Sequence, residues 1–239
     1  MKLQNQKVII MGGTSGMGLA TAKAATTAGA AVLITGRDQN KLDNALAELP
    51  QSASGEVVDA TVEKELRNSF GRSDPFDHLV LAVSGREGGG PFESLGVDTL
   101  KRAFDGKFWA QFMAAQMGLT KLRENGSIVF ITAASARTSI PGTAGLAAIN
   151  GALEAVIPTL ALELKPIRVN AVSPGVVKTP WWDTLASEQR EAVFKQTAQT
   201  LPVGRIGTPE DVAEVIMLLL GNGFMTSTVI ECDGGIRIK

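Results

Sequence analysis

Residues 7–18 read KVIIMGGTSGMG, an apolar run that passes directly into a cluster of glycines. The run is typical of a buried β-strand, and GLATAKAATTAG at 18–29 has the character of a helix. Between them, Gly12, Gly16 and Gly18 let the backbone approach a pyrophosphate, which the N–H groups and positive dipole end of a helix N-terminus attract. A plain glycine turn is the alternative, but the strand–turn–helix context favours a dinucleotide-binding loop.

The alternation of strand-like and helical segments continues along the chain. Helical stretches such as 40–49 and 209–221 separate further apolar, β-rich runs, which lie at 30–35, 55–60, 78–83, 127–132, 167–172 and 227–232. Apolar strands separated by helices indicate a parallel sheet covered on both faces. We therefore expect an α/β fold: a single-domain Rossmann fold over residues 1–239, with a doubly wound parallel sheet of about seven strands.

Composition narrows the classes of function. The chain has 239 residues, of which 44% are apolar, enough for a large core. Its net charge of −1 favours neither nucleic acid nor an acidic membrane surface. No apolar run approaches the roughly 18 residues of a membrane span, and the first residues do not resemble a signal peptide. We therefore expect no nucleic-acid or membrane partner.

The chain contains one cysteine, Cys232, and one histidine, His78. A single cysteine excludes an internal disulfide and favours a reducing compartment, so we expect a cytoplasmic protein. A lone histidine without nearby cysteines does not make a metal cluster, so no metal site is expected.

Four features of the sequence match one family together. The glycines are spaced G-x-x-x-G-x-G, Asp59 follows the third strand, NAVSPGVVKTP lies at 170–180, and DGG lies at 233–235. With these motifs the chain resembles the short-chain dehydrogenases/reductases over essentially its whole length. The resemblance implies a nicotinamide cofactor, hydride transfer and a small-molecule substrate. Cofactor contacts are expected from Gly12, Thr14, Ser15, Gly16, Met17, Gly18, Arg37, Asp59, Ala60, Ser84, Gly85, Lys107, Pro174, Gly175, Val177 and Thr179.

The end of the second strand predicts NADP rather than NAD. In NAD-binding proteins, a carboxylate at the tip of this strand binds the ribose 2′-hydroxyl. Here the tip is Gly36, which has no carboxylate, and the next residue is Arg37. A planar guanidinium suits the 2′-phosphate of NADP, because it can bind two phosphate oxygens at once. We interpret Asp38 as the N-cap of a helix beginning near Asn40. The alternative for Arg37 is a solvated surface charge.

Two further segments bear on the cofactor. Asp59 is expected at the tip of the third strand, a position that contacts the adenine in relatives; its alternative role, compatible with the first, is to cap a helix that starts near Val62. LAVSGREG at 81–88 stands where the family usually has N-N-A-G; the asparagines are gone, but Gly85 remains. Backbone can therefore still lie close to the cofactor there.

All four positions of the family's catalytic tetrad carry other residues. In the family a tyrosine exchanges the carbonyl proton, a lysine lowers its pKa and holds the ribose, a serine steadies the substrate oxygen, and an asparagine supports a water relay. The register of GSIVFITAAS (126–135) and FDGKF (104–108) assigns these positions, in the same order, to Leu146, Asn150, Ala133 and Lys107. The chain contains no tyrosine at all, so the usual mechanism is in doubt.

Three side chains are candidates for the missing roles. Lys107 can hold the ribose hydroxyls, stabilise an alkoxide or donate a proton if burial lowers its pKa; its alternative is a surface lysine. Asn150 can bind the ribose or a substrate oxygen; its alternative is a buried amide satisfied by backbone. Ser135 points toward the vacated serine position if the strand continues; its alternative is a loop hydroxyl with local bonds.

The segment at 176–207 resembles the family's substrate lid. Trp181 and Trp182 suggest an apolar or aromatic pocket, although one of them can also be ordinary core. With Leu146 in place of a hydroxyl, the floor of the pocket is apolar and favours a small hydrophobic carbonyl or quinone. The helices expected at 100–120 and 145–164 resemble those of the family's dimer interface, so we expect a homodimer or homotetramer.

Two functions from different classes remain open. The first is an NADP(H)-dependent oxidoreductase with a non-standard proton donor, either Lys107 or a bound water. The second is a catalytically inactive NADP(H)-binding sensor or assembly subunit. The lid favours the enzyme, because a sensor needs no cover over a substrate.

Overall fold

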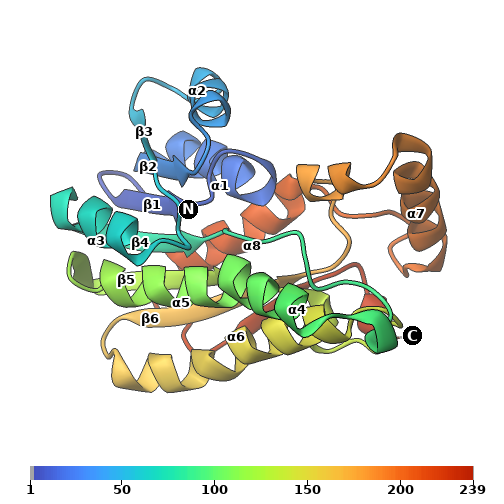
Figure 1. Cartoon of the computed structure of the whole chain (residues 1–239). Coiled ribbons are helices and arrows are strands. Elements are labelled where there is room, and N and C mark those ends of the chain that lie inside the picture. Colours follow the sequence, from blue (N-terminus) through green and yellow to red (C-terminus); the bar gives the residue numbers. More distant parts are fainter. Residues whose placement is uncertain (1–2, 239) are drawn as a thin grey trace.

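The computed structural model describes residues 3–238, and its strands form one sheet in which every neighbouring pair is parallel (Figure 1). The strand order is β3-β2-β1-β4-β5-β6-β7. This confirms the expected single-domain α/β fold with seven strands. Their bounds are β1 Lys7–Met11, β2 Ala31–Gly36, β3 Ala53–Val57, β4 Phe76–Leu81, β5 Leu122–Ile131, β6 Arg168–Pro174 and β7 Val229–Cys232.

Helices connect the strands and cover both faces of the sheet (Figure 1). The α-helices are α1 Gly16–Thr27, α2 Gln39–Ala47, α3 Glu63–Arg72, α4 Val97–Phe104, α5 Ala110–Gly118, α6 Ala144–Glu163, α7 Ser187–Thr200 and α8 Pro209–Gly221. A π-helical turn, η2 (Asp105–Trp109), joins α4 to α5. Short 3₁₀ turns are η1 Phe92–Ser94, η3 Ala134–Ala136, η4 Pro180–Thr184 and η5 Ile236–Ile238.

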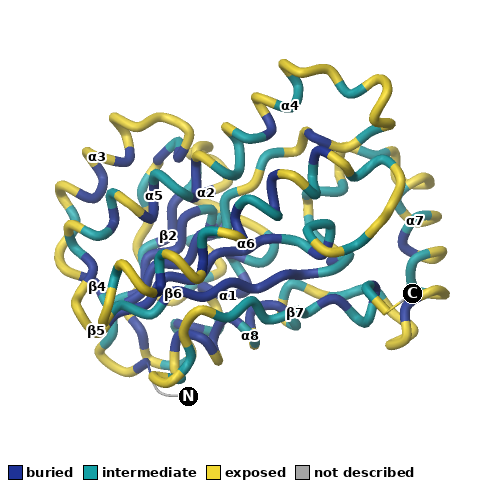
Figure 2. Tube along the Cα trace, turned by 90° about the horizontal axis from the view of Figure 1, so that it is seen from below, coloured by how far each residue is buried: buried dark blue, intermediate teal, exposed yellow. Residues whose placement is uncertain are grey.

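Strand β1 explains why the sheet needs helices on both sides. Successive side chains of a strand point to opposite faces. Val8 and Ile10 accordingly pack in a core with α1 and α8, whereas Ile9 and Met11 pack in another with α3, α5 and α6. Both faces are therefore apolar, and Figure 2 shows the buried positions concentrated along the central strands.

Two strands lie earlier in the chain than expected. Strand β4 spans Phe76–Leu81 rather than 78–83. The third strand spans Ala53–Val57 rather than 55–60, and three of its five residues are exposed. It lies at one edge of the sheet, where a strand can carry exposed polar residues. The more apolar residues that follow it therefore resembled a strand more closely than β3 itself does. Asp59 therefore lies two residues beyond the strand instead of at its tip.

Helix α6 has the length and hydropathy of a membrane span by composition alone: 20 residues with a mean hydropathy of 1.5. Its inner side chains, such as Ile149, Leu153 and Ile157, are fully buried against the sheet. Pro158 lies inside the helix. The apolar character of α6 thus serves in part to cover the sheet.

The order of the strands creates a crevice. The chain leaves β1 toward β2 and β3 on one side, and continues from β4 to β7 on the other side. Ligands of doubly wound sheets bind at the carboxyl ends of the strands at such a switch point. The glycine loop after β1 and the segment after β4 both lie at this point.

Candidate active site

A cavity of about 690 Å³ opens at the carboxyl ends of the strands. All the residues expected to contact cofactor or substrate line it, together with the three candidates for the missing catalytic roles. They come from the loops after β1 to β6 and from η2, α6 and η4. The fold therefore brings every sequence-predicted site residue to one cavity.

The glycine loop brings two stretches of backbone into close contact. Gly12 has a φ of +84°, and a Cβ there would lie 2.9 Å from the carbonyl carbon of Ala82. A Cβ on Gly18 would lie 2.2 Å from the Gly12 oxygen. No side chain of the described residues caps α1, and its first turn carries no acidic residue. The N-terminal N–H groups and dipole of α1 are thus available to a phosphate.

Two cations stand at the end of β2. Among residues 3–238, the side chains of Arg37 and Lys41 make no hydrogen bond or ion pair, and both line the cavity. The predicted role of Asp38 is confirmed: it is the N-cap of α2 and accepts a hydrogen bond of 2.9 Å from the Lys41 backbone N–H. Lys41 was missed in the sequence, although it lies four residues after Arg37 in the first turn of α2.

Asp59 lines the cavity, but the expectation that it caps the next helix is wrong. Helix α3 begins at Glu63, and no side chain caps it. Asp59 instead accepts hydrogen bonds from the backbone N–H and the hydroxyl of Thr61, at 2.9 and 2.7 Å. The carboxylate forms a local turn before the helix starts.

Lys107 reaches the floor of the cavity from the π-helical turn η2. Such turns often occur at functional sites, because the extra residue changes the direction in which side chains point. The Nζ of Lys107 donates a hydrogen bond of 3.1 Å to the carbonyl oxygen of Thr132, just past the end of β5. Burial lowers the pKa of Lys107 to about 8, and the charge of Glu154 partly opposes this effect. The interpretation as an outward-pointing surface lysine is therefore wrong.

Asn150 is 2% exposed and only partly satisfied. Its Nδ2 donates to the carbonyl of Leu146 at 2.8 Å and to the Ser135 hydroxyl at 3.1 Å. Its Oδ1 is buried without a partner among the described residues. A buried carbonyl oxygen without a donor costs free energy, so Oδ1 can accept a hydrogen bond from a ligand in the cavity.

Ser135 reaches the cavity by a different route from the expected one. The strand does not continue to it, since β5 ends at Ile131 and Ser135 lies in the 3₁₀ turn η3. The turn still places its hydroxyl beside Asn150. Ala133 and Leu146, at the vacated serine and tyrosine positions, also line the cavity.

A buried acid behind the cavity floor was missed in the sequence. Glu154, one turn after Asn150 on α6, is 9% exposed. It accepts hydrogen bonds from the Thr132 hydroxyl at 3.0 Å and from Arg137 Nε at 2.6 Å. Arg137 in turn binds Glu231 on β7 at 2.9 Å. Nothing in the local sequence separates Glu154 from an ordinary exposed glutamate, because its partners come from distant segments.

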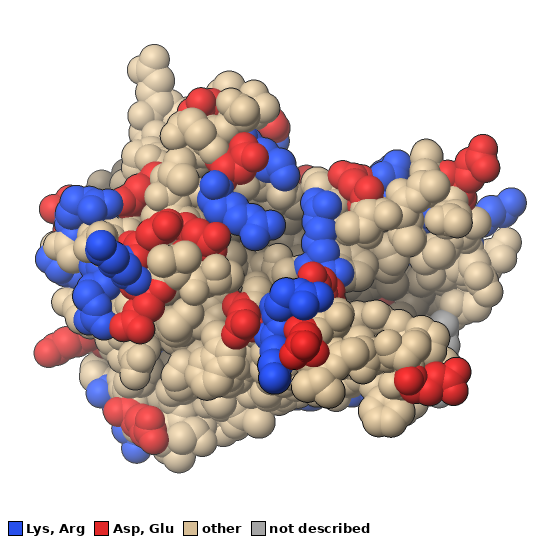
Figure 3. Space-filling view, viewed as in Figure 1, with Lys and Arg blue, Asp and Glu red and all other residues tan. Residues whose placement is uncertain are grey.

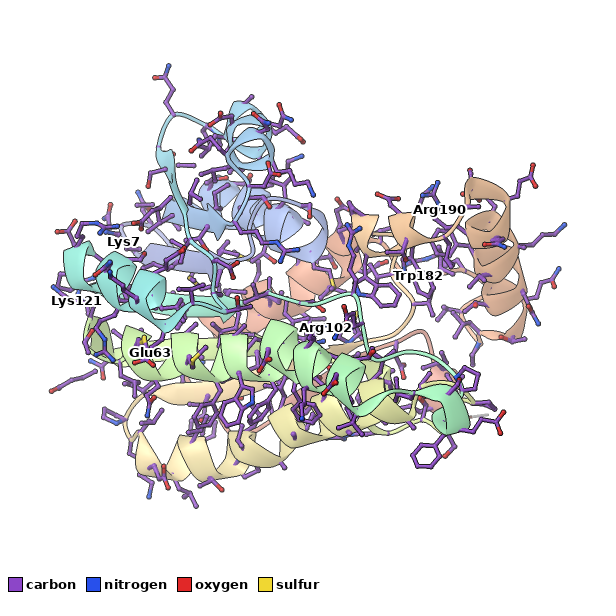
Figure 4. The ribbon with its side chains drawn as sticks, viewed as in Figure 1. Lys7, Glu63, Arg102, Lys121, Trp182 and Arg190 are labelled. Atoms are coloured by element: carbon purple, nitrogen blue, oxygen red, sulfur yellow. The ribbon has the colours of Figure 1, made fainter. Side chains whose placement is uncertain are left out.

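The two tryptophans of the 176–207 segment differ in their contacts. Trp181 Nε1 donates to the Gly85 carbonyl at 2.9 Å, across the cavity mouth. Trp182 Nε1 donates to Val177 within its own segment at 3.0 Å, and its ring packs edge-on against Phe194 of α7. Figure 4 shows Trp182 between the sheet and α7. One tryptophan thus packs inside the segment, while the other joins it to the loop after β4.

Charges of both signs are mixed on the outer surface. In the view of Figure 3, Lys and Arg side chains alternate with Asp and Glu, in keeping with the net charge of −1. Within residues 3–238, no three histidine, cysteine or acidic side chains are grouped to hold a metal ion.

Comparison with known proteins agrees with this geometry. The family model described as enoyl-(acyl carrier protein) reductase matches residues 12–237. The short-chain dehydrogenase/reductase ATR9 of Stachybotrys chlorohalonatus is 31% identical over 257 residues, which cover 99% of each chain.

Solved structures are similar over the whole chain as well. A crystal structure of a small-chain dehydrogenase in complex with NADPH is 32% identical, with a TM-score of 0.87, and the match covers 99% of this chain and 100% of that one. A variant of actinorhodin polyketide ketoreductase, solved with NADPH, is 25% identical with a TM-score of 0.90, and the match covers 100% of both chains.

Proposed function

Because the chain belongs to the short-chain dehydrogenase/reductase family, we propose that it is an NADP(H)-dependent oxidoreductase whose proton donor is not the family's tyrosine. The observation that carries the proposal is the Lys107 ammonium on the cavity floor, held by a single hydrogen bond to Thr132. A positive charge at the carboxyl edge of the sheet stabilises an oxyanion that forms there.

The residues of the cavity fit an NADP(H) molecule. The glycine loop and the N-terminus of α1 suit the pyrophosphate, and the unpaired Arg37 and Lys41 suit a 2′-phosphate. The unpartnered Asn150 Oδ1 suits a hydroxyl donor such as that of a ribose. Two structural relatives are complexes with NADPH, which supports the same cofactor here.

We assign each reaction role to a group of this chain. The nicotinamide of bound NADPH supplies the hydride. Lys107 Nζ stabilises the oxygen that becomes negative and gives it a proton, while Asn150 orients the ribose or the substrate. Trp181 covers the cavity mouth and limits the access of water.

The lining supports a small hydrophobic carbonyl compound or quinone as the substrate. Leu146 and Ala133 stand where hydroxyls are usual, and Ala103, Ile140 and Ile149 add further apolar surface. A charged or sugar-like substrate finds few partners on such a wall. The apolar floor also keeps Lys107 poorly solvated, which makes it a better proton donor.

A catalytically inactive NADP(H) sensor or assembly subunit is not favoured. The named relatives are dehydrogenases and reductases. In addition, Trp181 and Trp182 of the 176–207 segment line the cavity, which supports the role proposed for this segment as a substrate lid.

We further propose a cytoplasmic homodimer or homotetramer. Trp109 on η2 is 46% exposed and Leu162 on α6 is 65% exposed, so the helices expected to form an interface carry exposed apolar side chains. The free Cys232 suits a reducing compartment. The molar mass from light scattering at several protein concentrations tests the assembly; a monomer at all of them contradicts it.

NADPH oxidation against a panel of carbonyl compounds and quinones tests the function, after NADPH binding is confirmed by fluorescence. We expect turnover with at least one hydrophobic member. We also expect Lys107→Met to lower kcat by about a hundredfold or more, the usual contribution of acid–base catalysis. Lys101→Met, which removes an exposed lysine of α4, is the matched control. Tight NADPH binding without turnover, or full activity of Lys107→Met, would refute the proposal.

A further inference from the structure

We propose that Glu154 is a positioning residue for Lys107: together with Thr132 it fixes the ammonium in the cavity and keeps it charged. The inference rests on the role proposed above for Lys107. It gives a function to a buried acid that the cavity itself does not contain.

Thr132 connects the two side chains through its two oxygens. Its carbonyl oxygen accepts the Lys107 hydrogen bond at 3.1 Å, and its hydroxyl donates to Glu154 Oε1 at 3.0 Å and also approaches Val172 O at 3.2 Å. Thr132 is 1% exposed. The hydrogen bond to Glu154 restrains the Thr132 side chain and, with it, the position of the Thr132 carbonyl. Because this carbonyl accepts the Lys107 hydrogen bond, Glu154 limits where the Lys107 ammonium can lie.

Glu154 is also the counter-charge of the site. A buried ammonium is stable only near an opposite charge, and Glu154 is the acid whose charge acts on Lys107. Arg137 holds the other carboxylate oxygen, so the acid is paired on both sides.

Among the other charged groups on the elements around Lys107, Asp105 of η2 is exposed to solvent. Arg102 of α4 is paired with Glu87 of the loop after β4, at 3.0 Å. Arg86 donates to the Pro180 carbonyl at the lid. Helix α5 carries no charged residue. Glu154 is therefore the acid of α6 through which the charge of Lys107 can be altered selectively.

Glu154→Gln keeps the shape of the side chain and removes its charge. Because the negative charge near Lys107 is then lost and Arg137 keeps only Glu231 as an acidic partner, the charged form of Lys107 becomes less favourable and its pKa falls. A fall of about one unit, from about 8, raises the neutral fraction of Lys107 at about pH 7 roughly fivefold.

Trace labelling with acetic anhydride over a range of pH, read by mass spectrometry of the Lys107 peptide, measures this fraction without any need for turnover. We expect the titration of Lys107 to move to lower pH in Glu154→Gln and, by a smaller amount, in Thr132→Val. The pH dependence of the NADPH dissociation constant gives a second readout in the same variants. Glu231→Gln is the control, since it removes the other partner of Arg137 but leaves Glu154 in place.

The outcomes separate this inference from the proposed function. An identical Lys107 titration in the wild type and in Glu154→Gln overturns the inference, whatever the activity. A shifted titration together with undiminished turnover of Lys107→Met supports the link between Glu154 and Lys107, but overturns the role of Lys107 in the reaction. An equal shift in Glu231→Gln also overturns the inference, because the effect then comes from Arg137 alone.

Discussion

The proton state of Lys107 decides how the proposed reaction depends on pH. Its pKa is lowered to about 8, mainly by burial, and the donor form is the ammonium. That form is fully present below the pKa and is lost above it. We therefore expect kcat for substrate reduction to be level up to about pH 7.5 and to fall about tenfold per pH unit well above 8.

A variant that stays charged provides the control for this pH profile. Lys107→Arg keeps a cation at every accessible pH, because the guanidinium does not lose its proton. Whatever activity it retains should lack the decline above pH 8. The same decline in Lys107→Arg and in the wild type would assign it to another group.

At the residue scale, we expect Arg37 and Lys41 to favour NADP(H) over NAD(H). Neither side chain has a protein partner among the described residues, so both are available to a 2′-phosphate. We expect Arg37→Ala to raise the NADPH dissociation constant about ten- to thirtyfold, as for an exposed charge-assisted hydrogen bond, and Lys41→Ala to raise it less. Fluorescence titration with NADPH measures the effect, and NADH, which lacks the phosphate, is the internal control. An equal loss for both cofactors would mean that Arg37 supports the loop rather than the phosphate.

Among the elements, the parts that depend on local backbone chemistry were predictable. In the loop after β1, glycines let two stretches of backbone come into close contact. This requirement is visible in the sequence as the regular spacing of the glycines. The N-cap Asp38 is a local hydrogen bond of the same kind. By contrast, turn η3, which holds Ser135, and the π-helical turn η2, which holds Lys107, both contact α6, and no local sequence pattern records such long-range contacts.

Two hydrogen bonds join turn η4 to the loop after β4, one from Trp181 Nε1 to the Gly85 carbonyl and one from Arg86 to the Pro180 carbonyl. Trp181→Phe keeps an aromatic ring but removes the donor. We expect NADPH to dissociate about fivefold faster in stopped-flow measurements, the effect of one hydrogen bond worth about 1 kcal/mol. Trp182→Phe is the matched control, because its indole bond to Val177 stays within the lid. Equal rates for the two variants would contradict a closing role for Trp181.

At the scale of the whole molecule, the fold was predictable because each buried parallel strand appears in the sequence as a short run of apolar residues. Strands covered on both faces are apolar along most of their length, as residues 8–11 of β1 and 79–81 of β4 show. Strands β3 and β4 were each placed two or three residues too late, because apolar residues continue past the end of each strand. The pairing of Thr132 with Glu154 was not predictable, because it joins positions 22 residues apart through the packing of α6 on the sheet.

His78 links the stability of the whole molecule to pH. It is 3% exposed in the centre of the sheet, between Ser127 at 2.8 Å and Gln6 at 3.0 Å. Burial, with a smaller contribution from Arg168, lowers its pKa from 6.5 to about 4. The unfolded chain therefore binds a proton at a higher pH than the folded chain. Stability is complete above about pH 6.5 and declines as the pH falls toward about 4.

From these two pKa values we expect His78 to lower the free energy of unfolding by about 2 kcal/mol between about pH 7.5 and about pH 5. Urea unfolding at both pH values measures the change. Carboxylates contribute to it as well, so the comparison is with His78→Gln, which cannot titrate. This variant starts less stable, because it disturbs the bonds to Ser127 and Gln6, but it should lose about 2 kcal/mol less on acidification than the wild type. An equal loss in both proteins would mean that His78 is not the group whose protonation opposes folding.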